Sequence, residues 1–590
     1  MMDADGTKRL PDGVWVYVLA ALVGAVAGWR LCDLMPHAVT AAAALTGHIP
    51  YPADSLQHRI HAGGFSAIET LVAGALRLGL APSDAARLVY AVQGGLYGSA
   101  AALTIHALSR RTVAALAGSA FFLLFLPYAG GIAYSDYIVA VFAPPTHGIV
   151  GLGLILTLGA TVAAGWGAAS VIVLILAVLA HPIMGLFDGA LWAVLWGTRL
   201  WLTREDAAPR LRRAAWLGIA ALPVLGLLVW KGVTAGGGGD PHLTGLFYEL
   251  WDYHRSTRID GVLALMLAQV GGLAVLAGVW VRSGGLTDSE ELFAFHLILA
   301  AGSGIALYLG FHALRDSLPQ AVLMAMPNRF INIPLVASFP VLAGLLLRRR
   351  NDALMLLPLA VLLAAPVAGE FSGIVEFQPA AALFVGLTLA VRRPRDPAPV
   401  QAEERFGPWR RRGVAAALTL AGVGTLLILP ARSLMSEQPS ARTVADRLDA
   451  VGGPILFADI RTLEMVTALS PRTPVLLNIG ELDFIPYQPQ EIPQVAAILS
   501  ELYNVDFADP PSATRHRGGL ILDDAPLDMG GRTATRTHWE GLPRDRWGDL
   551  ARRHGFAAVA APSRWTLDLP GVFTIWTDPD RGVRIWRIPD

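Results

Sequence analysis

The chain has 590 residues, of which 54% are hydrophobic and only 16% are charged. With a mean hydropathy of +0.50, it is too apolar for a soluble protein of this length and has the composition of a polytopic membrane protein. The formal net charge of zero does not indicate a nucleic-acid partner. The single cysteine, Cys32, excludes an intramolecular disulfide and a cysteine-based metal cluster.

Hydropathy averaged over a window of about 19 residues predicts about thirteen membrane-spanning helices in a membrane module that covers residues 1–430. The predicted spans are 14–30, 85–108, 112–128, 147–164, 168–186, 189–202, 214–233, 261–281, 292–313, 330–347, 353–367, 379–391 and 414–430. The first span follows Lys8 and Arg9, and no cleavage site with a soluble mature chain comes after it. We therefore expect this span to be retained and not removed as a signal peptide.

Basic residues occur on alternate connections between the predicted spans, on the same side as Lys8 and Arg9. They are Arg110, Arg111, Arg282 and those in the segments 199–213, 348–350, 392–395 and 410–412. Because basic residues are retained on the cytoplasmic side, we expect a cytoplasmic N-terminus, an outer C-terminus and a location in the cell (inner) membrane. His181 and His296 fall within predicted spans. We expect both to pack inside the bundle, with His181 bonded to a backbone carbonyl that Pro182 leaves free.

The segment 31–84, which follows the first span, is the most polar outer connection. It begins with Cys32 and Asp33 and contains His37, an alanine-rich helix at 38–45 and the sequence GHIPYPAD at 47–54. A further helix is predicted at 65–80, where apolar residues recur at the spacing typical of a helix that lies on a membrane surface. Cys32 is therefore expected at the outer surface, where a labelling reagent reaches it.

The order of these features resembles the start of the glycosyltransferase C superfamily, in particular its branch of protein O-mannosyltransferases and aminoarabinose transferases. The resemblance covers about the first 110 residues: a first span, an acid, a Pro-Tyr-x-x-Asp turn, a His-containing turn, a surface helix and a second span opened by Arg87. Two features depart from that branch, because Leu34 stands where a second acid is common and His58-Arg59-Ile60 stands where His-Pro-Pro is usual. The span number and the outer C-terminal domain also resemble oligosaccharyltransferase catalytic subunits.

The resemblance implies that Asp33 is the catalytic carboxylate and that Tyr51 and Asp54 belong to the conserved turn of the family. A carboxylate next to the membrane is desolvated, which suits a general base, so Asp33 is the first candidate and Asp54 the second. Arginine binds phosphate through two parallel hydrogen bonds. Candidate groups that bind the phosphate of the donor are Arg255, Arg329, Tyr51 and His37.

Further acids and histidines on the outer connections are candidates for an acceptor or metal site. They are Asp136, His147 and His254. Asp136 and His147 together with Asp33 offer ligands that suit magnesium or manganese. No spacing in the sequence requires a metal, so the cofactor is left open.

Residues 431–590 have the composition of a soluble domain, and alternating strands and helices predict a small α/β sheet. Helices are predicted at 443–450, 462–469 and 544–554, and strands at 454–457, 474–477, 557–560, 572–576 and 583–587. The domain contains no dinucleotide-binding, nucleophile-elbow or metal-spacing motif. We interpret it as a lid or an acceptor-binding module without its own catalysis.

The sequence thus predicts a membrane glycosyltransferase that moves a sugar from a polyprenyl-phosphate-linked donor to an outer acceptor, which is a glycan, a lipid or a protein. Two alternatives remain open: a transporter or flippase of a lipid-linked envelope precursor, and a non-catalytic envelope assembly protein. A transporter is expected to have internal repeats and ionisable groups at mid-membrane. This sequence shows no repeat, and most of its acids lie at the predicted outer edge.

Overall fold

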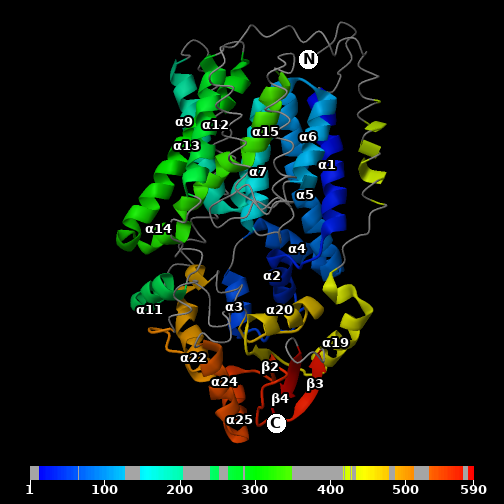
Figure 1. Cartoon of the computed structure of the whole chain (residues 1–590), viewed down its shortest axis with the longest axis vertical. Helices are drawn as coiled ribbons and strands as arrows, with labels where there is room; N and C mark the ends of the chain where they lie inside the picture. The colour runs from blue at the N-terminus through cyan, green and yellow to red at the C-terminus, as the bar shows by residue number, and fades with distance from the viewer. Residues whose placement is uncertain are drawn as a thin grey trace.

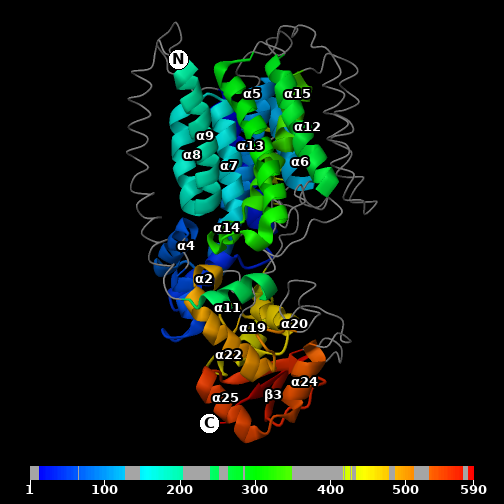
Figure 2. The same cartoon turned by 90° about the vertical axis from the view of Figure 1, so that its left-hand side faces the viewer.

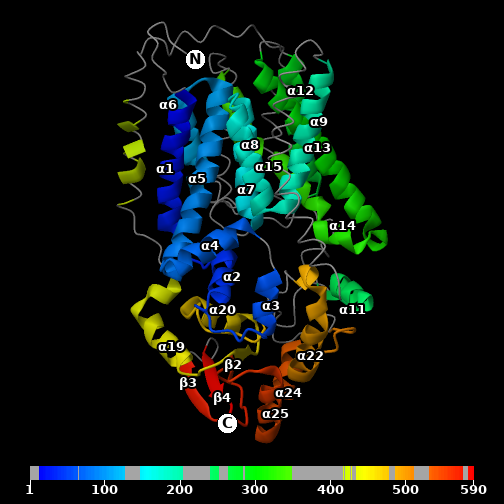
Figure 3. The ribbon, with the colours of Figure 1, turned by 180° about the vertical axis from the view of Figure 1, so that it is seen from behind.

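The computed structural model describes residues 12–63, 66–125, 147–202, 239–251, 263–282, 286–348, 434–477, 485–510, 531–575 and 582–589, with a few positions between 413 and 427. Figure 1 shows a bundle of helices at one end of the molecule and a smaller α/β domain, which contains the C-terminus, at the other. The helices of the segment 31–84 lie between these two parts, and the views in Figures 2 and 3 agree.

The bundle contains a closely packed pair of long helices, α1 (Asp12–Leu31) and α5 (Pro82–Ser109). A Cβ atom added at Gly24 or Gly28 would lie 2.1 or 2.0 Å from a carbonyl oxygen of α5. Helices in lipid associate mainly through close packing, and small residues at the interface permit it. Gly24 and Gly28 therefore set the distance between α1 and α5.

The remaining helices of the bundle pack around this pair. They are α6 (Thr112–Phe125), α7 (His147–Ala163), α8 (Gly167–Ala180), α9 (Pro182–Leu202), α12 (Leu263–Arg282), α13 (Asp288–Leu314), α14 (Gln320–Ala325), the 3₁₀ turn η5 (Pro327–Ile331) and α15 (Asn332–Arg348). Among the described residues, 4 helical stretches are long and apolar enough to cross a membrane: Gly13–Leu31, Pro82–Ser109, Asp288–Leu314 and Val322–Arg348. A mostly helical fold with candidate membrane-spanning helices is thus confirmed, while about thirteen spans remain a prediction.

Helices occupy the predicted spans wherever these are described, with one boundary in a different place. The sequence predicts a span at 168–186, but α8 ends at Ala180 and α9 begins at Pro182. Proline is favoured in the first turn of a helix, where its missing N–H would be unpaired in any case, so it starts a new helix here. The predicted spans 214–233, 353–367 and 379–391, and most of 414–430, lie outside the described residues.

The segment 31–84 forms α2 (His37–Leu45), α3 (Leu56–Gly63) and α4 (Ala67–Arg77). The sequence predicts α2 and α4, whereas α3 forms where a turn was expected. Ser66 starts α4 by accepting a hydrogen bond from the Ile68 N–H at 3.2 Å, as Ser does at helix N-termini. One face of α4 is buried, while Leu71 and Leu78 beside it are 74% and 91% exposed.

The C-terminal domain holds a 4-stranded sheet in the order β1-β2-β4-β3, in which only the pair β1–β2 is parallel. Its strands are β1 (Ile455–Phe457), β2 (Ala558–Pro562), β3 (Gly571–Ile575) and β4 (Val583–Arg587), and its helices are α19 (Pro439–Asp449), α20 (Ile460–Leu469), α22 (Ile492–Tyr503), α24 (Gly531–Gly541) and α25 (Arg544–His554). The predicted α/β sheet is confirmed. The segment 474–477 contributes a single bridge, between Val475 and Ile455, and α22 and α24 were not predicted.

The core of this domain is completed by residues from the membrane module. Leu56 and Ile60 of α3 and Phe247 and Trp251 of the π-helical turn η2 (Phe247–Trp251) are buried in one cluster with residues of α22, α24 and α25. Trp251 also donates a hydrogen bond from Nε1 to the carbonyl of Phe507 at 2.8 Å. Because apolar burial is the main stabilising term in folding, the domain depends on these contacts for part of its stability.

The close approach of α1 and α5 yields a prediction about folding. Substitution Gly24→Ala places a methyl group against a backbone carbonyl that cannot move aside, and overpacking of this kind costs about 1–3 kcal/mol. We expect a lower thermal midpoint for the full chain in detergent. The control is Gly278→Ala in α12, where an added Cβ meets no atom within 4 Å, and an equal effect of both substitutions would contradict the proposed role of Gly24.

Candidate active site at the domain-facing end of the bundle

Polar side chains from four separate elements meet at the end of the bundle that faces the C-terminal domain. Glu69 lies on α4, His147 is the first residue of α7, His181 separates α8 from α9, and Arg329 lies in η5. The Ser66 hydroxyl bonds the carbonyl of Ala180 at 3.4 Å, which ties the start of α4 to the end of α8. The sequence singled out Arg329 and His147 of this group and missed Glu69.

Glu69 and His147 form a direct pair. Oε1 of Glu69 lies 3.1 Å from Nε2 of His147, and these side chains are 7% and 17% exposed. A carboxylate and an imidazole in contact are able to hold and pass a proton, which is the requirement for general acid–base chemistry. This pair therefore lies between the segment 31–84, which contains α4, and the bundle helix α7.

His181 stands next to this pair. It lies within electrostatic range of both His147 and Arg329, and α7 packs against it so closely that a Cβ at Gly151 would lie 2.8 Å from its own Cβ. Its Nδ1 accepts a hydrogen bond from the Met184 N–H at 3.3 Å. His181 was expected to bond a backbone carbonyl that Pro182 leaves free. For Nδ1 this expectation is wrong, because the first turn of α9 offers an N–H group instead.

Arg329 and its neighbour Asn328 are buried, with exposed fractions of 5% and 1%. A snorkelling arginine at a helix end keeps its charge in water, which does not describe Arg329. Neither the oxygen nor the nitrogen of the Asn328 amide has a hydrogen-bond partner among the described residues. A buried amide without a partner costs free energy, so these atoms are suited to bind a polar ligand. No pattern in the sequence indicated a role for Asn328.

Asp33 lies two positions beyond the end of α1 and is half-buried. It and the charged pair Arg87–Glu437 all act electrostatically on the thiol of Cys32. Arg87 Nη2 lies 2.5 Å from Glu437 Oε2 and thereby links α5 to the start of the C-terminal domain. Arg87, which the resemblance placed at the opening of the second span, therefore holds the domain next to Asp33.

Tyr51 and Asp54 lie where the segment 31–84 meets the C-terminal domain. The Tyr51 hydroxyl accepts a hydrogen bond from the Val475 N–H at 3.2 Å. The Asp54 side chain is exposed, and its backbone carbonyl accepts a hydrogen bond from Arg59 Nη1. Both residues therefore support the contact between the segment and the domain.

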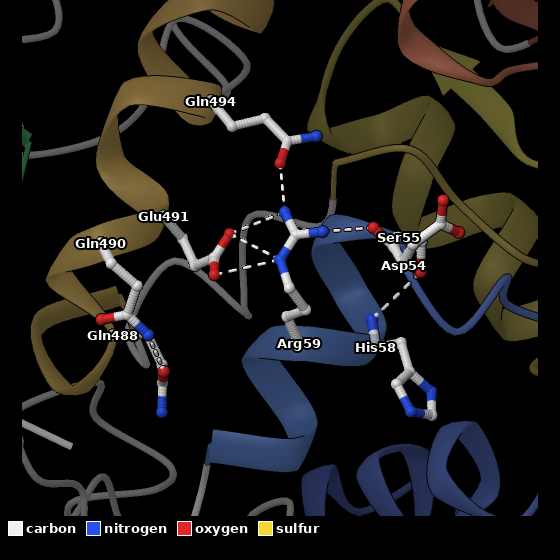
Figure 4. A network of polar contacts seen from close by, with 8 residues as sticks. All are labelled: Asp54, Ser55, His58, Arg59, Gln488, Gln490, Glu491 and Gln494. Atoms are coloured by element: carbon white, nitrogen blue, oxygen red, sulfur yellow. Dashed lines mark hydrogen bonds and ion pairs between the residues drawn. The ribbon is translucent and has the colours of Figure 1, made fainter. Parts of the chain in front are cut away.

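Arg59 is at the centre of this contact, as Figure 4 shows. Its Nε lies 3.0 Å from both carboxylate oxygens of Glu491, its Nη2 lies 2.8 Å from Oε2, and it also bonds the side-chain oxygen of Gln494. The hydrogen bond to Glu491 raises the pKa of Arg59. Close packing accompanies this network, because Gly63 contacts Gln488 and Gly239 contacts Pro489 with no room for a Cβ.

The remaining candidates are His37, which the structure describes, and three residues that it does not describe. His37 is exposed at the start of α2, and Asp136, His254 and Arg255 lie outside the described residues. Within the described part of the chain, no group of three or more His, Cys, Asp and Glu side chains is arranged to hold a metal ion.

A polar pair that no sequence pattern indicated lies inside the bundle. His296 was interpreted as a packing residue, but its Nε2 lies 2.7 Å from Oδ1 of Asp188, and both residues are buried. Trp192 donates to the other oxygen of Asp188 at 3.2 Å and stacks on the His296 ring at a centroid distance of 4.0 Å. The pair joins α9 to α13.

Comparisons with known proteins do not assign this chain. No protein-family model, no curated protein and no solved structure matches it.

The burial of Cys32 leads to a prediction about its reactivity. The side chain is 0% exposed, so the expectation of a labelled surface thiol is wrong. Burial raises the pKa of Cys32 from 9.0 to about 12; the cation of Arg87 opposes this shift, and the carboxylates of Asp33 and Glu437 add to it. The thiolate is the reactive form, and at pH 8 this shift lowers its fraction about 1000-fold. We expect alkylation of the native chain, followed by mass spectrometry, to be slower than that of the denatured chain by at least this factor; equal rates would contradict the buried position.

The Arg59–Glu491 contact yields a third prediction. Glu491 is buried while Arg59 is 37% exposed at its side chain, so Arg59→Leu leaves a carboxylate with no cation in contact. We expect a double-mutant cycle with Glu491→Gln, measured by thermal unfolding in detergent, to give a coupling of about 1–2 kcal/mol. The i,i+4 pair Arg536–Glu540 within α24, whose side chains are 43% and 24% exposed, is the control, with an expected coupling of about 0.3–0.5 kcal/mol. A coupling for Arg59–Glu491 no larger than this control would contradict its role as the link.

Proposed function

We propose that the protein is a membrane glycosyltransferase which transfers a sugar from a polyprenyl-phosphate-linked donor to an acceptor on the outer side. The observation that supports this proposal best is the buried group at the domain-facing end of the bundle. A cationic side chain, Arg329, and an unpaired amide, Asn328, lie there together with the proton-holding pair Glu69–His147. These are the groups that departure of a phosphate and deprotonation of an acceptor require.

In this reaction the acceptor hydroxyl attacks the anomeric carbon, and the bond between that carbon and the phosphate oxygen breaks. The lipid phosphate leaves with the electron pair of that bond, and the acceptor proton passes to a carboxylate. Arg329 is placed to hold the phosphate, because a guanidinium forms parallel hydrogen bonds with phosphate oxygens. Asp33 is our first candidate for the carboxylate, and Glu69 with its partner His147 is the second.

A lipid-linked donor suits the position of the site. Glu69 lies on α4, whose neighbouring Leu71 and Leu78 are exposed apolar residues of the kind that enter the lipid boundary. The acceptor is an envelope glycan, lipid or protein, and the docked C-terminal domain is proposed to help bind it. The outer side is assigned from the arginines at the opposite end of the bundle, since basic residues favour the cytoplasmic side. We also propose a location in the inner membrane, and a requirement for magnesium or manganese is left open.

A second candidate function is the transport or flipping of a lipid-linked precursor. The buried pair Asp188–His296 favours it, because ionisable groups inside the bundle are frequent in transport pathways. The role of a non-catalytic envelope assembly protein has no comparable support from the described residues.

The test is transfer by the purified full chain in liposomes that contain a polyprenyl-phosphate-linked sugar and a hydroxyl acceptor. We expect Asp33→Asn to lower turnover by about 10² to 10⁴, the usual loss for a general base. Asp54→Asn should cost much less, because Asp54 supports Arg59 through its backbone carbonyl. Donor binding should be unchanged in Asp33→Asn and weakened in Arg329→Lys, since lysine cannot form the parallel pair of hydrogen bonds.

Three outcomes separate the alternatives. Normal turnover in Asp33→Asn with a severe loss in Glu69→Gln would transfer the role of the base to Glu69. Movement of the donor across the bilayer without sugar transfer, abolished by Asp188→Asn, would support a flippase and reject the transferase. Transfer from a soluble nucleotide sugar with no lipid-linked donor present would reject the proposed donor.

A further inference from the structure

Arginines gather at the end of the bundle that is opposite the C-terminal domain. Arg110 and Arg111 form the connection from α5 to α6, and Arg348 ends α15. The upper part of Figure 1 shows the ends of these helices next to the start of α13. The candidate active site lies at the other end, so this second group has no part in it.

A single buried carboxylate is shared by two of these arginines. Glu290 is 1% exposed, and its Oε1 lies 3.0 Å from Arg110 Nη2 and 3.3 Å from Arg348 Nη1. Its other oxygen accepts a hydrogen bond from the Thr287 N–H at 2.9 Å, which forms the capping box of α13. Both oxygens of Glu290 are therefore already occupied.

Arg111 has no such partner. The residue is 7% exposed, and its Nε and Nη1 make no hydrogen bond within the described part of the chain. A buried guanidinium without an anion is unfavourable by several kcal/mol. An arginine that served only to orient the protein in the membrane would extend its charge into water, so its burial needs a separate explanation.

A second feature at the same place attracts an anion. Arg111 immediately precedes α6, whose first turn is closed by a hydrogen bond from the Ala115 N–H to the Arg111 carbonyl at 3.1 Å. The first N–H groups of a helix have no partner within it, and with the helix dipole they form a ready anion site. Arg110 adopts a left-handed conformation with φ 59°, which ends α5 and allows α6 to begin two residues later, at Thr112.

We propose that Arg111, together with Arg110, Arg348 and the N-terminus of α6, binds a phosphate group. The two sources of that chemistry at a membrane surface are the headgroup of an anionic phospholipid and free phosphate. Basic pockets between transmembrane helices on the cytoplasmic side are suited to anionic headgroups. The bound phosphate supplies a negative charge to Arg111, because both oxygens of Glu290 are already occupied. It also links α5, α6 and α15.

The test is binding of defined lipids to the purified full chain, measured by native mass spectrometry in detergent. The ligands are phosphatidylglycerol, the zwitterionic phosphatidylcholine and inorganic phosphate. We expect Arg111→Gln to weaken phosphatidylglycerol binding about 10- to 100-fold, which corresponds to the loss of one charge-assisted hydrogen-bonded contact. Arg111→Lys keeps the charge and should lose less. The control is Arg199→Gln at the same end, because Arg199 is already paired with Asp288 at 2.5 Å.

Thermal unfolding without added lipid separates this role from a structural one. If Arg111 binds a ligand, its charge has no counter-ion among the described residues of the ligand-free protein. The variant Arg111→Gln should therefore unfold at the same temperature as the wild type or at a higher one. Added phosphatidylglycerol should raise the midpoint of the wild type only. If inorganic phosphate raises the midpoint of the wild type as much as phosphatidylglycerol does, free phosphate is the ligand. A lower midpoint in Arg111→Gln with and without lipid, or equal binding of all three ligands to both proteins, would overturn the proposal.

Discussion

The insertion of α3 into the core of the C-terminal domain is the contact on which the candidate site depends. Leu56 and Ile60 supply the apolar part of this contact, and Arg59 supplies the polar part through Glu491. The segment 31–84 is consequently held at both ends, by α1 and α5 on one side and by the domain on the other. Ordering the backbone of this segment costs about 1–2 kcal/mol per residue, so the contacts at both ends help to keep Asp33 and Glu69 in fixed positions.

The two ends of the bundle carry different chemistry. At the domain-facing end, an acid, two histidines and Arg329 come together from elements far apart in the sequence. At the opposite end, arginines outnumber the single buried acid Glu290. Basic residues at a membrane surface orient a protein by their number. The polar group at the domain-facing end, in contrast, depends on defined contacts between its side chains. This difference is the reason for assigning the chemistry to the domain-facing end.

Local sequence patterns predicted much of the fold. Hydropathy located the bundle helices, and the alternation of strands and helices identified the α/β domain. The helix α3 was missed because its sequence, LQHRIHAG, is polar over most of its length and its two core residues pack against partners more than 180 positions away in the chain. Burial of Leu56 and Ile60 against distant parts of the chain stabilises this helix, and a local sequence pattern does not show such distant contacts.

The same limit applies to the candidate site. The sequence identified Asp33, His147 and Arg329 as polar residues at membrane boundaries, but Glu69 looked like part of the exposed face of a surface helix. Its burial results from contact with α7 and α8. His296 appeared alone because Asp188, 108 positions earlier, lies on a different helix. Pairs of this kind are set by helix packing, which hydropathy does not describe.

Unpaired polar atoms distinguish the two candidate functions. Both oxygens of Asp188 are used within the bundle, one by His296 and one by Trp192, and only Nδ1 of the imidazole lacks a partner among the described residues. A transported ion or headgroup needs ligand atoms that are free to bind it, so this pair is better suited to hold α9 against α13. Asn328 lies beside a buried guanidinium, and neither polar atom of its amide has a partner within the described part of the chain. Asn328 therefore has more unfilled binding capacity among the described residues than the Asp188–His296 pair, and this difference favours the proposed enzyme over a transporter.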